Sequence, residues 1–590
     1  MPGRVWSVSG PVVVATGMVS SPVGNQVSVG ERGLVGEIVA ISGDKSIIQV
    51  YEDTTGLSPG QEVYDKGYPL SVELGPGLIG NIFDGIQRPL DRIRAKCGIF
   101  VENGVQTSPL DRDRHWDFKP ILSLGDHVEA GMVLGEVEET SLITHRILVP
   151  LGIEGEVTWI AGEGKYRIED VVARVKTTDG REVELKMYQR WPVRKKRPVR
   201  QRLRPEIPLI TGQRVIDFLF PVALGGVSAI PGGFGTGKTI TQHQLAKWAS
   251  AEVVIYIGCG ERGNEITQVL DEFPKLQDPR TGKPLIERTI IIANTSNMPV
   301  AAREASVYTG ITLAEYYRDQ GYNVALMADS TSRWAEALRE IAGRLEMMPA
   351  EEGYPAYLAA RLGEFYERAG YAEVLNGSKG SITVIGAVSP PGGDFSEPVT
   401  MHTKRFVRTF WALDKRLAGQ RHFPSINWME SYSGYVNDLT KWWDENVKNA
   451  VWSELRQEIM TLLQEADRLE KVAQLIGVDA LPDAQRLIIE TSRLVRFGFL
   501  QQNAYSSVDS FCSPEKGVRI IEIILEFYRR ANEMLSLGIH VLTIVEMGIF
   551  SEIMRLKEEI PNDQLDRFEE FKEEMSKAFQ ELEAKYGTGI

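Results

Sequence analysis

Cysteine is scarce in this chain of 590 residues, which contains only Cys97, Cys259 and Cys512. Three widely spaced thiols cannot build a disulfide framework, so a reducing compartment such as the cytoplasm is expected. The seven histidines show no metal-ligand spacing with one another or with the cysteines. The sequence therefore gives no support to a zinc site.

Long apolar runs and an excess of basic residues are also lacking. No run of about 18 apolar residues occurs, which excludes an obvious membrane-spanning helix. The segment Met1–Trp6 lacks the apolar region of a signal peptide. Lysine and arginine number 66 against 80 acidic residues, so the formal charge is −14. Sequence-independent nucleic-acid binding is disfavoured, because it depends on neutralising phosphates with positive charge.

The chain is too long for one hydrophobic core, and its patterns change along its length. Residues 1–70 contain short β-branched runs separated by turn residues, which predicts a small closed barrel. Residues 115–190 form a second β-rich stretch. From about 205 to 435, apolar strands alternate with helical segments, which predicts a mostly parallel sheet covered on both faces. After about 440 the pattern is helical, with Gly477 as a helix stop.

Two segments have alternative interpretations. The 115–190 stretch resembles barrel-sandwich domains that carry biotin or lipoate, but no lysine matches the one that those domains modify, so structural packing is favoured. The basic run Arg194–Pro198 is predicted to be a solvated linker. A nucleic-acid patch or a targeting signal is the alternative for this run.

The strongest chemical signal is the segment Gly232–Thr239, GGFGTGKT, which fits the pattern G-x4-G-K-[ST]. Glycines let the backbone wrap a phosphate, and the N-terminus of the following helix adds partial positive charge. Lys238 would reach the β- and γ-phosphates, and the Thr239 hydroxyl would bind Mg²⁺. The apolar strand Val227–Ile230 precedes the motif, and a helical pattern follows it. This context favours a nucleotide-binding loop over an unused glycine-rich turn.

Two further strands end in acidic residues. The apolar run Val324–Ala328 is followed by Asp329, as in a Walker B element that holds the Mg²⁺ shell. The strand Val253–Ile257 is followed by Gly258–Glu265. In that segment Glu261 could polarise the attacking water, Arg262 could contact the γ-phosphate, and Glu265 could accept hydrogen bonds from Mg²⁺-bound water. A charged turn with local salt bridges is the alternative, and the preceding P-loop disfavours it.

Several long motifs identify a family. Gly260–Glu265, Asn294–Pro299, Ala301–Glu304, Asp329–Ala337 and His422–Trp428 resemble the catalytic A subunits of vacuolar/archaeal-type rotary ATPases. The similarity extends over nearly the whole chain, and the 115–190 stretch matches the bulge domain of these subunits. The β subunits of F-type enzymes and the flagellar or secretion ATPases lack that domain.

The resemblance implies a division into five parts: an N-terminal β-barrel (1–70), a connecting segment (71–114), a β-rich bulge insertion (115–190), a RecA-like α/β P-loop domain (191–437) and a C-terminal helical bundle (438–590). It also implies that Glu261, Lys238 and Arg262 are catalytic. Thr239 would bind Mg²⁺ directly, and Asp329 and Glu265 would do so through water.

The resemblance further implies how ATP or ADP is held. The nucleotide-binding residues would be Gly232, Gly233, Phe234, Gly235, Thr236, Gly237, Lys238, Thr239, Ile240, Arg333, Phe423 and Tyr505. The last two map onto the aromatic pocket for adenine, because aromatic rings suit a flat base. Ordinary core packing is the alternative for each ring.

The resemblance also implies partners: three A and three B subunits would form a ring with central and peripheral stalks, and a B subunit would supply an arginine in trans. The complex would lie on the cytoplasmic face of a membrane, held by its sector that translocates H⁺ or Na⁺. Two other functions are considered. A hexameric RecA-like nucleic-acid motor should show a basic or aromatic nucleic-acid surface. A non-catalytic ring subunit should lack the equivalent of Lys238 or Glu261, and this chain has both.

Overall fold

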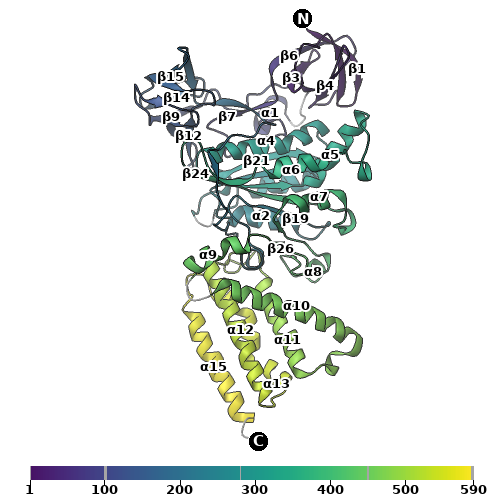
Figure 1. Cartoon of the computed structure of the whole chain (residues 1–590), viewed down its shortest axis with the longest axis vertical. Helices are drawn as coiled ribbons and strands as arrows, with labels where there is room; N and C mark the ends of the chain where they lie inside the picture. Colours follow the sequence, from purple (N-terminus) through teal and green to yellow (C-terminus); the bar gives the residue numbers. More distant parts are fainter. Residues whose placement is uncertain (1, 99–102, 279–280, 448–450, 587–590) are drawn as a thin grey trace. The chain divides into compact units, whose positions relative to one another are not determined.

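The computed structural model describes residues 2–98, 103–278, 281–447 and 451–586. The chain folds into two compact units, each built from separate stretches of sequence. The first unit consists of Met1–Arg204, Leu224–Ala229 and Ala251–Val407, and the second of Pro205–Ala223, Ile230–Ser250 and Arg408–Ile590. Figure 1 labels many of the elements of both units.

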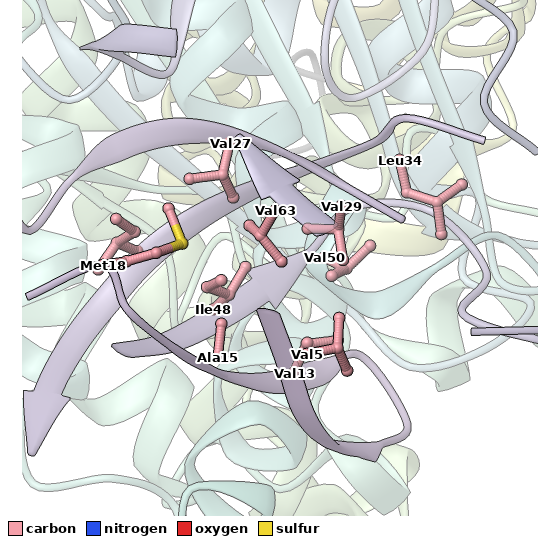
Figure 2. Close-up of a cluster of buried hydrophobic side chains, with 11 residues drawn as sticks. Val5, Val13, Ala15, Met18, Val27, Val29, Leu34, Ile48, Val50 and Val63 are labelled. Atoms are coloured by element: carbon pink, nitrogen blue, oxygen red, sulfur yellow. The ribbon is translucent and has the colours of Figure 1, made fainter. Parts of the chain in front are cut away.

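The first unit begins with a closed β-barrel, as the turn-rich sequence predicts. Its strands are hydrogen-bonded in the order β1-β2-β5-β4-β3-β6. Alternate residues point inward, and Val13, Val27, Ile48 and Val63 are fully buried in the core shown in Figure 2. Closure leaves no unpaired strand edge. The strands are β1 (Gly3–Ser9), β2 (Val12–Thr16), β3 (Asn25–Val29), β4 (Leu34–Ser42), β5 (Lys45–Val50) and β6 (Glu62–Pro69).

The second β-rich stretch forms two four-stranded sheets, with orders β10-β13-β15-β16 and β12-β11-β9-β14. A short pair, β7 with β17, accompanies them. The strands are β7 (Ser71–Leu74), β9 (His115–Pro120), β10 (His127–Val128), β11 (Val133–Glu138), β12 (Thr144–Leu148), β13 (Gly155–Ile160), β14 (Gly164–Arg167), β15 (Val171–Thr177), β16 (Glu182–Lys186) and β17 (Gln189–Pro192).

A buried polar network links this β-rich part to the helix α4 (Val300–Asp319). The Glu139 carboxylate pairs with His145 Nδ1 at 2.8 Å, and His145 Nε2 lies 2.9 Å from the Tyr316 hydroxyl. Glu139 Oε1 also accepts hydrogen bonds from three backbone N–H groups, Gly77 to Ile79, at 2.8–3.0 Å. Burial raises the pKa of Glu139, but His145 and the N–H donors lower the pKa by more, so it lies below its usual value.

Replacing Glu139 with glutamine should expose the backbone of residues 77–79 to solvent exchange. The change removes the negative charge at the centre of this buried network. Breaking a buried ion pair such as Glu139–His145 typically lowers the free energy of unfolding by about 3–5 kcal/mol. Hydrogen–deuterium exchange of the amides of residues 77–79 should accelerate by about 10²-fold or more. The exposed pair Arg174–Glu184 provides a control. Glu184→Gln should leave exchange at residues 77–79 unchanged, and equal acceleration in both variants would refute the role of the network.

The central sheet of the first unit is mostly parallel, and its strands have the order β19-β24-β22-β20-β21-β8. β20, β21, β22 and β24 pair in parallel, whereas β23 pairs antiparallel with β24 and with β18. α4 packs against β20, β21 and β22 and is buried from Ala301 to Asp319. The strands are β8 (Ile82–Phe83), β18 (Gln201–Arg202), β19 (Val227–Pro231), β20 (Val253–Glu261), β21 (Thr289–Thr295), β22 (Asn323–Asp329), β23 (Gly370–Glu373) and β24 (Lys379–Val388).

Two details of the first unit differ from the sequence prediction. β20 continues to Glu261, so this carboxylate ends a strand instead of lying in a loop. The basic run is not a solvated linker throughout, because Arg197 is only 6% exposed and Arg194 is half-buried against Glu37 and Glu304. The other α-helices are α1 (Leu90–Cys97), α3 (Gly263–Glu272), α5 (Thr331–Arg344), α6 (Leu358–Tyr366) and α7 (Pro398–Phe406), and short 3₁₀ helices span Leu285–Arg288, Glu351–Gly353 and Pro391–Gly393.

The second unit combines the P-loop segment with the C-terminal helices. Its core includes Trp443 and Trp452, which stack with ring centroids 5.0 Å apart. Gly477 follows α10 as its C-cap, as predicted. The elements are a π-helix (Val215–Leu219), α2 (Lys238–Trp248), β25 (Thr409–Phe410), α8 (Lys415–Gly419), β26 (Tyr432–Ser433), α9 (Val436–Asn446), α10 (Trp452–Ile476), a 3₁₀ helix (Val478–Ala480), α11 (Asp483–Arg493), a π-helix (Leu494–Leu500), α12 (Pro514–Ser536), α13 (Val541–Val545), α14 (Gly548–Glu559) and α15 (Arg567–Tyr586). Across the described ranges, we find no helix with the length and apolar character that crossing a membrane requires.

Candidate nucleotide site

The P-loop has the backbone of a phosphate cradle. Gly235 and Gly237 have φ angles of +80° and +81°, which side-chain-bearing residues rarely adopt. α2 begins at Lys238, so Lys238 and Thr239 lie in the first turn of this helix, where backbone N–H groups favour an anion. The Thr236 hydroxyl donates to the Gly233 carbonyl at 2.8 Å and braces the turn.

A cavity of about 330 Å³ lies beside the P-loop in the same unit. Its lining includes Gly237, Ile240, Phe423 and Tyr505. Phe423 is 40% exposed and Tyr505 is 87% exposed, so these rings do not serve as core packing. A Cβ atom at Gly237 would lie 3.3 Å from the Phe423 ring, which places that ring against the loop backbone. The volume and the aromatic lining suit a flat heterocyclic base.

Buried polar side chains hold one wall of this cavity in place. Gln502, only 3% exposed, lines the cavity, and its backbone N–H donates to the Phe423 carbonyl at 2.8 Å. Arg214 donates to the carbonyls of Phe499 and Gln501 at 2.5 and 2.8 Å and forms an ion pair with Asp509. The backbone that carries the polar lining residues is therefore fixed by contacts within the second unit.

Lys557 belongs to the same wall. Its ammonium donates to the carbonyls of Phe497 and Gln501 at 2.7 and 2.9 Å, and the residue lines the cavity. Burial lowers the pKa of Lys557 to about 8. Lys557 lies on α14, so the last part of the helical bundle helps to shape the cavity.

The predicted carboxylates gather in the first unit, at the ends of two adjacent strands. β20 ends at Glu261 and β22 at Asp329, and Gly258 is the direct parallel neighbour of Asp329. Asp329 is 1% exposed and accepts a hydrogen bond of 3.2 Å from the Tyr256 hydroxyl. Burial, together with the negative charges of Asp329, Glu261 and Glu265, raises the pKa of Tyr256 well above its usual value. Of these three carboxylates, Asp329 contacts the tyrosine directly, and Glu261 and Glu265 act on it through their charge.

Charged residues next to these carboxylates lie at the starts of the helices α3 and α5. Arg262 is the exposed N-cap of α3, and Glu265 lies in the first turn, where the helix dipole favours a negative charge. Arg333 donates to Glu336 at 2.8 Å, and this bond, together with the charges of Glu261 and Glu265, raises the pKa of Arg333. The structure thus brings Glu261, Glu265, Asp329 and Arg333 together in the first unit.

The second unit carries the P-loop residues, Phe423 and Tyr505. Phe234 is 80% exposed and does not line the base cavity, whereas Ile240 does. Gly260, with φ of +70°, is required beside the carboxylates, because a Cβ atom there would lie 2.8 Å from Arg333.

The predicted Mg²⁺ ligands are chemically suitable for that ion. Mg²⁺ prefers hard oxygen ligands and keeps several waters, so it needs only one or two protein carboxylates in addition to substrate phosphates. The Thr239 hydroxyl and the carboxylates of Asp329 and Glu265 provide such oxygens. No cluster of three or more histidine, cysteine, aspartate or glutamate residues in the described part of the chain forms a ready-made metal site.

Sequence reasoning missed several residues. Tyr256 lies within an apolar strand, where nothing marks its bond to Asp329. The polar run Gln501–Asn503, which is separated from Tyr505 only by Ala504, was a usable signal for the cavity wall. Lys557 was not predictable, because its position in an amphipathic helix is typical of a surface lysine.

Comparisons with known families match most of the chain. The "ATP synthase alpha/beta family, beta-barrel domain" matches residues 5–67, and the "ATPsynthase alpha/beta subunit barrel-sandwich domain" matches residues 107–194. The "ATP synthase alpha/beta family, nucleotide-binding domain" matches residues 212–433. The "C-terminal domain of V and A type ATP synthase" matches residues 440–542.

A solved structure shares the fold. The assembled ATPase EscN of the enteropathogenic E. coli type III secretion system aligns with a TM-score of 0.64 and 20% identity, over 89% of this chain and 99% of that one.

Individual relatives match from end to end. The "V-type ATP synthase alpha chain" of Halothermothrix orenii is 56% identical over 99% of both chains. The A subunit of the A-type ATP synthase of Methanopyrus kandleri is 57% identical over 98% of both chains, and that of Hyperthermus butylicus is 58% identical over 99% of this chain and 98% of its own. The chain therefore belongs to the family of A subunits, or alpha chains, of V-type and A-type ATP synthases.

Proposed function

We propose that this chain binds Mg·ATP and hydrolyses or synthesises it as the catalytic A subunit of a V/A-type rotary ATPase. One observation carries the proposal: the adjacent strands β20 and β22 end in Glu261 and Asp329, in a chain that also has a complete P-loop. Phosphoryl transfer needs a phosphate cradle, a metal-binding acid and a group that orients water. A non-catalytic ring subunit would lack part of this set, and a nucleic-acid motor does not explain the matches outside the P-loop.

Each residue has a defined task in this proposal. The P-loop N–H groups and Lys238 bind the β- and γ-phosphates, and the cavity at Phe423 and Tyr505 holds the adenine. Glu261 accepts a proton from the attacking water and orients it. Arg262 and Arg333 place positive charge near the γ-phosphate. Thr239 would bind Mg²⁺ directly, and Asp329 and Glu265 would bind it through water. When bound, Mg²⁺ would neutralise charge on the phosphates.

The partners follow from family membership. The chain is part of a multi-subunit complex with B subunits and stalks. We place it on the cytoplasmic face of a membrane, attached only through the ion-translocating sector. We also retain the proposed domain division at residues 70, 114, 190 and 437. The complex would couple ATP turnover to rotation and to transport of H⁺ or Na⁺.

Glu261→Gln should separate binding from chemistry. The amide keeps the shape of the side chain but cannot accept the proton, so hydrolysis by the assembled complex should fall by roughly 10²-fold or more. Affinity for Mg·ATP, measured by equilibrium binding, should stay within about twofold of the original, because the phosphate cradle is unchanged.

A matched control uses the same region of the chain. Asp271 is an exposed carboxylate on α3, and Asp271→Asn should leave both rate and affinity unchanged. If affinity falls in parallel with the rate in Glu261→Gln, Glu261 is a binding residue and the proposed role is wrong.

A further inference from the structure

The first unit contains a second cavity, of about 250 Å³, whose lining is strongly basic. We call it the basic cavity and define it by Lys196, Arg197, Arg202, Glu315, Arg318 and Arg368. These residues come from the basic run, from β18, from the last turns of α4 and from the turn after α6. The proposed ATP site uses none of them.

The charges in the basic cavity do not balance. Five positive side chains line it, and the carboxylates that contact them are Glu315, which is also in the lining, and Asp319. Arg368 donates to both Glu315 oxygens, at 3.0 and 2.6 Å, and Arg318 donates to Asp319. These carboxylates are therefore neutralised already, and an excess of three positive charges remains.

Arg197 gives a second, independent indication of a ligand. It is 6% exposed, and its Nε donates to Asp319 at 2.5 Å. Its Nη1 is buried, and no described group accepts a hydrogen bond from it. A buried guanidinium N–H without an acceptor is costly, so an acceptor is expected to reach it.

The remaining two cations lie nearer to solvent. Lys196 is exposed, and among the described residues no carboxylate forms a salt bridge with it. Arg202 donates to the carbonyls of Ala369 and Glu367, at 3.3 and 2.6 Å, so its charge meets no carboxylate either. The lining also includes the small residues Ala369, Gly370 and Ala372.

We propose that the basic cavity is a binding site for a small multivalent oxyanion of the phosphate class, separate from the P-loop. Guanidinium groups donate paired N–H bonds to phosphate oxygens, and Lys196 adds a mobile point charge. The volume of the cavity equals that of about eight water molecules at roughly 30 Å³ each. This space is enough for phosphate or diphosphate with some hydration. A bound oxyanion would contact the basic run, α4 and β23 at the same time.

Calorimetric titration of the full chain with inorganic phosphate, and separately with pyrophosphate, tests the proposal. The titration is done in the Lys238→Ala background, which removes the lysine expected to bind phosphate at the P-loop. We expect saturable binding of at least one of the two anions with a Kd of about 1 mM or tighter. The affinity should fall as salt rises, because Lys196 and Arg202 are exposed.

Variants at the cavity distinguish this site from residual binding at the P-loop. Lys196→Gln with Arg202→Gln should weaken the binding by about tenfold or more, because each removes a charged donor. Lys195 is the matched control: it is exposed and adjacent in sequence, but it lies over the Trp191 ring and does not line the cavity. Lys195→Gln should bind as tightly as its parent. Absence of saturable binding, or equal binding in all variants, would overturn the proposal.

Discussion

Lys238→Ala is expected to abolish ATP hydrolysis and to weaken nucleotide binding. Lys238 is the first residue of α2 and directly follows Gly237, whose left-handed backbone turns the chain into the helix. Its ammonium compensates charge on the β- and γ-phosphates, and this charge grows as the phosphoryl group is transferred. Removing the ammonium should reduce turnover by about 10³-fold or more, since losing one preorganised donor already costs about 10²–10³.

The experiment compares two lysines of one helix. Lys247 lies in the last turn of α2, where it covers the Trp248 ring, and not at the P-loop. Lys247→Ala should retain turnover, which shows that α2 tolerates loss of a lysine. Steady-state hydrolysis and equilibrium binding of Mg·ATP are measured in the assembled complex. Normal turnover in Lys238→Ala would refute the P-loop assignment.

The architecture was predictable from the sequence because it depends on local patterns. Short β-branched runs with turn residues predicted a barrel, and its inward-facing Val27 and Ile48 are fully buried. The apolar run before Asp329 predicted a strand, and β22 ends at that residue. Parallel pairing of such strands brings their carboxyl ends to one edge, so the grouping of Glu261 with Asp329 also followed from the pattern.

Other features were not predictable, because they depend on contacts between residues distant in sequence. The basic run had the composition of a linker, yet Arg197 is buried against Asp319, more than a hundred residues away. Lys557 is a basic residue in an amphipathic helix, and only the fold places it against the carbonyls of Phe497 and Gln501. In such cases the local sequence indicates neither the residue that the basic side chain contacts nor how deeply that side chain is buried.

The isolated chain should bind ATP but hydrolyse it slowly, and B subunits should raise the rate by about 10³–10⁵-fold, the gain that an arginine finger supplies. The arginines near the carboxylates have contacts of their own in this chain. Arg333 donates to Glu336 at 2.8 Å, and Arg303 donates to the Ser296 carbonyl at 2.8 Å. Arg262 follows Glu261 directly, so it is poorly placed to approach the γ-phosphate from the side opposite to the water.

A titration tests whether the positive charge of the arginine finger comes from another protein of the complex. Hydrolysis per catalytic chain is measured alone and with increasing amounts of the B subunit, and sedimentation reports the assembly at each point. The rate should rise with the alternating ring and reach a plateau when the two proteins are equimolar. Glu261→Gln chains should assemble equally well and show a plateau at least about 10²-fold lower, which assigns the stimulated turnover to this chain's own carboxylate. Full activity in a monodisperse monomer would instead mean that the chain carries every group that phosphoryl transfer requires, and the shared site would have to be abandoned.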